Sequence, residues 1–265
     1  MTISKRGRTA RRALWASALA ATMLWTGGSA RADGDDGIKE LIKSMSDYLD
    51  AQKSISFDME TNLEVVTTDG QRLALASSGS VELNRPDKLR AERKGGFADV
   101  EAVYDGKTLT ILGKNLNLYT QLPISGDVDH LVTELRDTYG RPLPAADLLL
   151  TDSYKHLMAE VTDVKYLGPG VILGQMCEHV AMRAQDVDLQ LWIAEGDAPY
   201  PCRYTITSRT VPGEPQYSVD IWNWKASTTA GTGDFSFTPP SGAQAVTPDK
   251  LTDTDELPSH LTPKQ

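Results

Sequence analysis

The sequence predicts an α+β fold in which an antiparallel sheet is covered by helices. Three observations predict it: many short segments alternate apolar and polar residues, turn dipeptides separate these segments, and two stretches show helical spacing of apolar residues. The pattern occupies roughly 200 residues without an internal repeat, which is within the usual size of one domain. We therefore expect a single domain over residues 33–240.

Two stretches show helical spacing. The first runs from Ile38 to Leu49, and acidic residues precede it, where the helix dipole favours negative charge. The second begins at Val128, reaches Tyr139, and is followed by shorter helical pieces over 144–150 and 154–159. Each stretch has one apolar side, so both need a surface to cover.

The strands are predicted from strict alternation. In residues 55–65 the apolar side chains lie on one face and the polar ones on the other. Asp69-Gly70 and Asp105-Gly106 lie between such runs, and Asp-Gly is typical of hairpin turns whose two central residues need positive φ. Further strands are expected over 74–83, 88–93, 99–104, 109–112 and 116–122, and again between Val161 and Ala226.

The N-terminus resembles an export signal. The basic stretch Lys5–Arg12 is followed by the apolar segment Ala13–Thr26 and the small-residue site Ala30-Arg31-Ala32. We expect residues 1–32 to be a signal peptide that is cleaved after Ala32, by either the general secretory or the twin-arginine route. No other apolar run approaches the length of a transmembrane helix, so the mature chain is expected to lack a transmembrane segment.

The charge distribution indicates an acidic mature protein. The predicted signal peptide holds six of the 27 basic residues and none of the 36 acidic ones. A surface of this kind repels nucleic acid and anionic lipid, so no nucleic-acid partner is expected. From residue 241 onward the composition shifts to Pro, Thr, Asp and Lys, which predicts a flexible C-terminal tail over 241–265.

The two cysteines, Cys177 and Cys202, are candidates for a disulfide in an oxidising compartment. If 176–183, 189–194 and 203–207 form a three-stranded meander, the cysteines lie on its outer strands, about 9 to 10 Å apart. A disulfide needs Cα atoms within about 7 Å. The bridge therefore forms only if one cysteine lies beyond the end of the middle strand, and the sequence leaves this open.

No set of residues points to an enzyme. The four histidines are scattered, no G-x-S-x-G motif is present, and no acid, base and nucleophile converge by type and spacing. We expect no catalytic residues, no metal site and no cofactor. Trp192, Trp222 and Trp224 are expected on the sheet face opposite the alternating apolar residues, where they either pack as core or line a ligand pocket.

Several segments carry a family resemblance. They are Arg85-Pro86-Asp87-Lys88-Leu89-Arg90, Tyr104-Asp105-Gly106-Lys107-Thr108-Leu109, Asn117-Leu118-Tyr119 and Pro144-Ala145-Ala146-Asp147-Leu148-Leu149-Leu150. In this order they resemble the periplasmic outer-membrane lipoprotein carrier LolA and its relatives. The chain also resembles an uncharacterised branch of predicted periplasmic proteins, in Met45-Ser46-Asp47-Tyr48-Leu49, Cys177-Glu178-His179-Val180 and Asp188-Leu189-Gln190-Leu191-Trp192-Ile193.

The resemblance implies a LolA-like fold: a strongly curved antiparallel sheet, or incomplete barrel, whose concave face is closed by helices and binds acyl chains. It implies a soluble periplasmic, non-enzymatic binder or carrier of a lipid, an acyl chain or a lipidated protein. An alternative is an envelope sensor or scaffold that binds another protein through the same fold. The candidate cavity residues, which the pattern equally allows as packed core, are Phe57, Met59, Leu63, Val65, Leu189, Leu191, Ile193, Val219 and Ile221.

Overall fold

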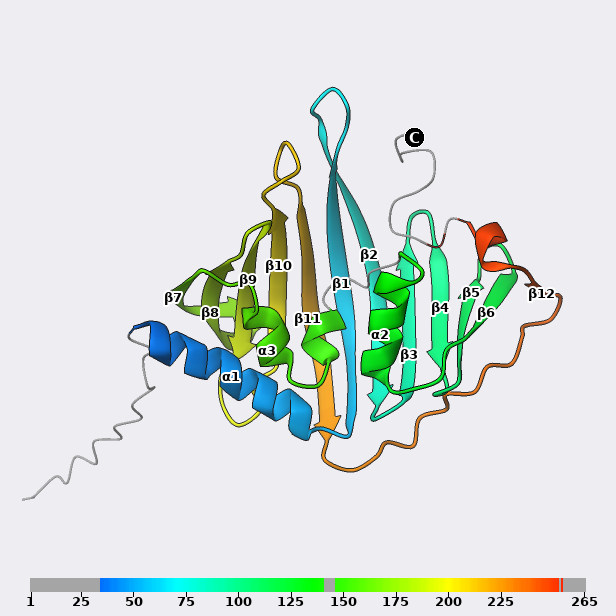
Figure 1. Ribbon diagram of the computed structural model, residues 1–265, viewed down its shortest axis with the longest axis horizontal. Helices are drawn as coiled ribbons and strands as arrows, with labels where there is room; N and C mark the ends of the chain where they lie inside the picture. The colour runs from blue at the N-terminus through cyan, green and yellow to red at the C-terminus, as the bar shows by residue number, and fades with distance from the viewer. Residues whose placement is uncertain (1–33, 141–145, 253, 255–265) are drawn as a thin grey trace, which may run out of the picture. The chain divides into compact units, whose positions relative to one another are not determined.

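The computed structural model describes residues 34–140, 146–252 and 254, and in this part of the chain twelve strands form one sheet (Figure 1). The strand order is β12-β6-β5-β4-β3-β2-β1-β11-β10-β9-β8-β7. The first six strands are β1 (Ser54–Val66), β2 (Arg72–Asn84), β3 (Lys88–Gly95), β4 (Asp99–Tyr104), β5 (Thr108–Gly113) and β6 (Leu118–Pro123). The others are β7 (Asp163–Ile172), β8 (Gln175–Arg183), β9 (Val187–Ala194), β10 (Pro201–Ser208), β11 (Gln216–Ser227) and β12 (Gln244–Ala245). Every pairing is antiparallel except that of β12 with β6.

The predicted turns are confirmed at both Asp-Gly pairs. Gly70 lies between β1 and β2 and Gly106 between β4 and β5, each with φ of 87°. The expectation of positive φ at both turn residues is wrong, because only the glycine of each pair adopts it. At the second turn the Asp105 carboxylate instead accepts the backbone N–H groups of Lys107 and Thr108.

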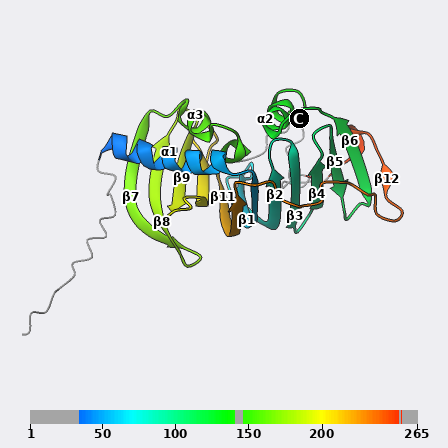
Figure 2. The ribbon, with the colours of Figure 1, turned by 90° about the horizontal axis from the view of Figure 1, so that it is seen from below.

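The helices are α1 (Asp35–Ala51), α2 (Val128–Asp137) and α3 (Ser153–Met158), with a short 3₁₀ turn, η1 (Ala146–Leu149). A second 3₁₀ turn, η2, covers Pro248–Lys250. All three α-helices lie on one face of the sheet (Figures 1 and 2), which we call the helix face; the opposite side is the outer face. No described helix is long and apolar enough to cross a membrane.

The main core lies between the helices and the helix face. Residues 38, 42, 45 and 49 of α1 and residues 128, 131, 132 and 135 of α2 are buried there. The sheet contributes alternate residues of β1, β2, β8, β9 and β11, among others, as the alternation predicted. The predicted combination of an antiparallel sheet with a covering helix layer is therefore confirmed.

The predicted strong curvature is not confirmed. The sheet is open and not strongly curled, and its end strands, β12 and β7, do not pair with each other (Figure 2). Strand β7 contains Gly168-Pro169-Gly170 and a register shift between Tyr166 and Gly168. Proline has no N–H to offer a further strand, which makes β7 suited to an edge and opposes closure into a barrel.

The chain after β11 packs on the domain, and so do residues 244–251 of the predicted tail. Residues 228–243, which we call the crossing segment, run from β11 to the far edge of the sheet (Figure 1). On the outer face, Arg90 of β3 donates hydrogen bonds to the carbonyls of Asp234 and Ser236. Strand β12 then pairs with β6, and Leu251 is buried. The isolated leucine of this polar stretch therefore has a packing role, while residues 255–265 lie outside the described residues.

The disulfide between Cys177 and Cys202 is present, with Cα atoms 7.0 Å apart. Cys177 pairs with Ala194, the last residue of the middle strand β9, and Cys202 falls at a bulge where β10 leaves its register with β9. The condition set by the sequence is not met, because both cysteines lie opposite residues of β9 and neither lies beyond its end. The bridge forms instead at the bulge, where the irregular backbone around Cys202 allows the two Cα atoms to approach to 7.0 Å. The predicted signal peptide and its cleavage site after Ala32 lie outside the described residues.

Candidate functional site

The predicted cavity residues lie on the helix face, and most of them are core. Five are buried in the main cluster: Phe57, Leu191, Ile193, Val219 and Ile221. Met59 and Leu189 are partly buried and pack against this cluster. Leu63 and Val65, near the end of β1, are also partly exposed but do not belong to it. The structure therefore brings seven of the nine together in one apolar layer beneath the helices.

Three aromatic rings stack on one another in this layer. Trp224 stacks between Phe57, with ring centroids 5.5 Å apart, and Tyr200, with centroids 4.9 Å apart. The Trp224 indole N–H also donates a hydrogen bond to the Tyr48 hydroxyl of α1. The prediction that Trp224 lies on the outer face is wrong, because the register of β1 and β11 shifts beside Asn223, whose φ is 52°.

A polar junction holds the helix layer at its edge. Arg85, just after β2, donates a hydrogen bond of 2.8 Å to the Leu149 carbonyl of η1. The Asp50 carboxylate of α1 accepts the N–H of Asp152, and the Asp129 carboxylate of α2 accepts the N–H of Thr151. We call these residues the helix junction. It joins α1, α2 and the segment that leads to α3 at one place.

Burial governs the ionisation of the helix junction. It lowers the pKa of the Arg85 guanidinium, and the charges of Asp129 and Asp50 oppose this. Burial also raises the pKa of Asp50, while the hydrogen bond from the Asp152 backbone opposes that shift. The Arg85 Nε atom is buried without a hydrogen-bond partner in the described part of the chain. The contacts of Arg85 thus hold a partly desolvated charge in place.

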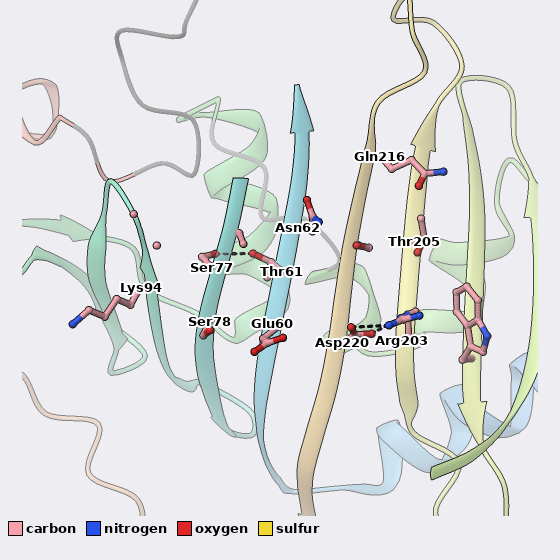
Figure 3. Close-up of a pocket in the computed structure, with 15 residues that line it drawn as sticks. Glu60, Thr61, Asn62, Ser77, Ser78, Lys94, Arg203, Thr205, Gln216 and Asp220 are labelled. Atoms are coloured by element: carbon pink, nitrogen blue, oxygen red, sulfur yellow. Dashed lines mark hydrogen bonds and ion pairs between the residues drawn. The ribbon is translucent and has the colours of Figure 1, made fainter. Parts of the chain in front are cut away.

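A second site lies on the outer face, where a groove of about 660 Å³ crosses the middle of the sheet (Figure 3). We call it the outer groove. Its lining comprises Glu60, Thr61, Asn62, Ala76, Ser77, Ser78, Lys94, Gly95, Gly96, Trp192, Arg203, Thr205, Gln216, Ser218 and Asp220. Small residues on β2 and β11 leave the floor low, and the longer side chains of β9 and β10 form a wall.

The strand register explains why these residues meet. One continuous cross-strand row, with one residue from each of seven neighbouring strands, runs through Lys94, Ser78, Glu60, Asp220, Arg203, Trp192 and His179. Arg203 donates two hydrogen bonds to the Asp220 carboxylate, one of them 2.8 Å long. This hydrogen bonding raises the pKa of Arg203. The Trp192 ring is fixed by stacking on His179, with centroids 3.9 Å apart.

The sequence predicted neither the helix junction nor the outer groove. Arg85 was part of a recognised segment, but its hydrogen bond to Leu149 spans 64 residues and no periodicity encodes it. The sequence indicates part of the groove, because Glu60 and Asn62 alternate with apolar residues of β1 and so belong to the outer face. The neighbours of these two residues on the other strands depend on the strand register, which alternation does not predict.

Residues 39–247 match a family described as predicted periplasmic protein (DUF2092). The chain belongs to this family. The predicted assignment to a family of periplasmic proteins is therefore confirmed, and membership in DUF2092 together with the disulfide agrees with export.

One curated relative of this DUF2092 chain is an uncharacterized protein of Methanocaldococcus jannaschii, which is 22% identical over 217 residues. The match covers 80% of the present chain and 55% of the relative, so the chain spans about half the length of that protein.

Solved structures are similar to the DUF2092 chain at low sequence identity. LprF from Mycobacterium bovis matches with a TM-score of 0.43 and 12% identity, over 78% of this chain and 97% of LprF. A LolA superfamily protein from Nitrosomonas europaea matches with a TM-score of 0.34 and 8% identity, over 71% of this chain and 92% of that protein.

Proposed function

We propose that the protein is a periplasmic, non-enzymatic binder or carrier of a lipid, an acyl chain or a lipidated protein. The ligand enters between the helices and the helix face of the sheet. The observation that carries the proposal is the construction of this layer: an apolar sheet face is closed by α1 on one side and by α2, η1 and α3 on the other, and these elements meet at the helix junction. Separation of these segments from the sheet opens the apolar layer without unfolding the sheet.

The energetics favour such a ligand. Each methylene group removed from water contributes roughly 0.8 kcal/mol, so a long acyl chain gains on the order of 10 kcal/mol. That gain offsets the loss of contacts between the helices and the sheet, since the ligand replaces one apolar surface by another. Phe57, Met59 and Ile221 on β1 and β11, with Leu191 and Ile193 on β9, form the surface that the ligand contacts in this proposal.

The test is native mass spectrometry of the exported full chain, purified from the periplasm without detergent, followed by solvent extraction. We expect an added mass that extracts as lipid, or one that appears after incubation with phospholipid or an acylated peptide. A bare mass under all three conditions contradicts the proposal.

The helix junction gives a sharper version of the same test. Replacement Arg85→Ala removes the hydrogen bond to Leu149 and relieves the buried charge. We expect faster uptake of a fluorescent fatty acid and a free energy of unfolding lower by about 1–3 kcal/mol. The matched control is Arg136→Ala, because Arg136 is exposed on α2 and bonds its neighbour Asp137. Equal uptake rates in the two variants would contradict opening at the junction.

A second candidate function is binding of another envelope protein. The hairpin of β7 and β8 exposes three apolar side chains: Val171 is 60% exposed, Leu173 67% and Met176 43%. Val171 and Met176 pair directly across the hairpin, so these side chains form one patch, and such patches mark interaction sites. Cross-linking from residue 173 in intact cells tests this candidate, and Val171→Ser should abolish any protein adduct that it yields.

A further inference from the structure

We propose that the outer groove is a binding site for an uncharged oligosaccharide. The groove is on the face of the sheet opposite the apolar layer, so this proposal is independent of lipid binding (Figure 3). At about 660 Å³ its volume lies within the range of about 300–1,000 Å³ that is common for small-molecule sites.

The first argument is unused hydrogen-bonding capacity. Among the described residues, Glu60, Asn62, Ser78, Thr205 and Ser218 have no side-chain hydrogen-bond partner, although all five line the groove. Together they offer a carboxylate, an amide and three hydroxyls, which can donate and accept in several directions. A ligand with many hydroxyl groups matches this mixture, because each hydroxyl both donates and accepts.

The second argument is charge balance. The lining holds two acidic and two basic residues. Arg203 and Asp220 neutralise each other through paired hydrogen bonds, and Lys94 lies 3.3 Å from the Asp99 carboxylate. Only the Glu60 carboxylate has no ion-pair partner among the described residues. This leaves no cationic excess for a phosphate or a polyanion, so the groove favours a ligand without net negative charge.

The third argument distinguishes a glycan from a peptide. The groove lies on the face of the sheet, where the backbone N–H and C=O groups are already used between strands, so it offers no main-chain ladder to an extended peptide. Its lining contains no aliphatic side chain larger than Ala76 and therefore no pocket for apolar peptide side chains. Recognition through side-chain amides, hydroxyls and carboxylates is what sugar hydroxyls require.

Trp192 supplies the apolar part of the recognition. It is the one aromatic residue of the lining, and it is held by the His179 ring on one side and the Arg203 guanidinium, 5.7 Å from its ring centroid. Because His179 and Arg203 flank this ring from the neighbouring strands β8 and β10, the C–H surface of a sugar meets the edge of the ring, which is held fixed at little cost in side-chain entropy. The groove thus combines one rigid apolar wall with a polar floor.

The test is isothermal titration of the full chain with a panel of neutral trisaccharides: maltotriose, cellotriose, mannotriose and chitotriose. We expect saturable binding of at least one, and an affinity at least tenfold lower in the double variant Glu60→Gln with Asn62→Ala, since two polar contacts are lost. The matched control is Glu92→Gln, because Glu92 is exposed on the outer face of β3 but does not line the groove. It should bind like the native chain.

A second variant, Ser218→Tyr, fills the floor of the groove from β11 and should also abolish binding. Urea unfolding and binding of an apolar dye check that each variant is folded and keeps its helix-face layer. The proposal is overturned if no trisaccharide binds saturably at millimolar concentration, or if binding survives in both groove variants. It is equally overturned if an extended peptide, and no sugar, binds in a way that these variants abolish.

Discussion

The two faces of the central strands differ in burial and polarity: the helix face is buried and apolar, and the outer face is open and polar. On the helix face, β9, β11 and β1 contribute Leu191, Val219 and Phe57 to a buried apolar core. On the same strands Trp192 and Asp220, one residue along, and Glu60, three residues along, belong to an open polar groove. The helix face is closed by packing and can admit a ligand only if the helices move. The outer groove is already formed and needs no movement.

Alternation alone does not assign every side chain to a face. Strand β11 carries Trp222 and Trp224 two residues apart, a spacing that places both on one face of a regular strand. The irregularity beside Asn223 sends Trp224 to the helix face, while Trp222 pairs with Asp58 on the outer face. A single bulge therefore places Trp224 against the core and not on the outer face. Substitution of Trp224 and of Trp222 compares the contributions of the two faces to stability.

The largest expected effect separates these two tryptophans. Trp224→Ala removes two ring stacks and the hydrogen bond to Tyr48, so we expect the free energy of unfolding to fall by about 3–5 kcal/mol. Trp222→Ala, on the same strand, is the matched control and should cost about 1 kcal/mol or less. Urea unfolding followed by circular dichroism measures both. Equal losses of unfolding free energy would show that Trp224 on the helix face is no more important for stability than Trp222 on the outer face.

Removal of the disulfide measures how much the small cluster on the outer face contributes to the free energy of unfolding. Cys177 and Cys202 form a small buried cluster with Ile172 and Ala194, separate from the main core. Replacing both cysteines by alanine frees a loop of 25 residues in the unfolded chain, and we expect a loss of about 3 kcal/mol. The same loss should follow reduction of the native chain, whereas a reductant should leave the double variant unchanged. A loss well below 1 kcal/mol would show that this cluster adds little to the fold.

The elements of the fold could be predicted because their signals are local. The apolar spacing from Ile38 to Leu49 and the alternation in residues 55–65 each depend on neighbours within a few residues, and the structure has α1 and β1 there. The ordered segment after residue 240 was missed because its burial depends on a few contacts with distant strands, such as Leu251 beside β5. Composition alone does not contain such contacts.

The sites were harder to predict than the fold. Glu60 and Asp220 lie 160 residues apart and become neighbours only through the register of β1 and β11. Arg85 and Leu149 lie 64 residues apart and are joined by a hydrogen bond that no local pattern predicts. Most apolar residues of the helix face, by contrast, could be named in advance, since a regular strand places alternate side chains on one face. Sequence patterns therefore identified the face but not the partners across it.

The smallest expected effect concerns His179, at the end of the groove row. Burial lowers the pKa of its ring below the ordinary value of 6.5, while the hydrogen bond with Gln190 opposes the shift. The native state therefore holds the proton less tightly than the unfolded chain does. The contribution of neutral His179 to stability is complete above pH 6.5 and is lost as the pH falls through that value toward the lowered native pKa. We expect His179→Gln to flatten the decline in unfolding free energy between about pH 7.5 and 5.5. The change in unfolding free energy should be smaller than the losses expected for Trp224→Ala and for removal of the disulfide. Urea unfolding at several pH values measures the slope, and an unchanged slope would mean that the ring beside Trp192 is solvated like any surface histidine.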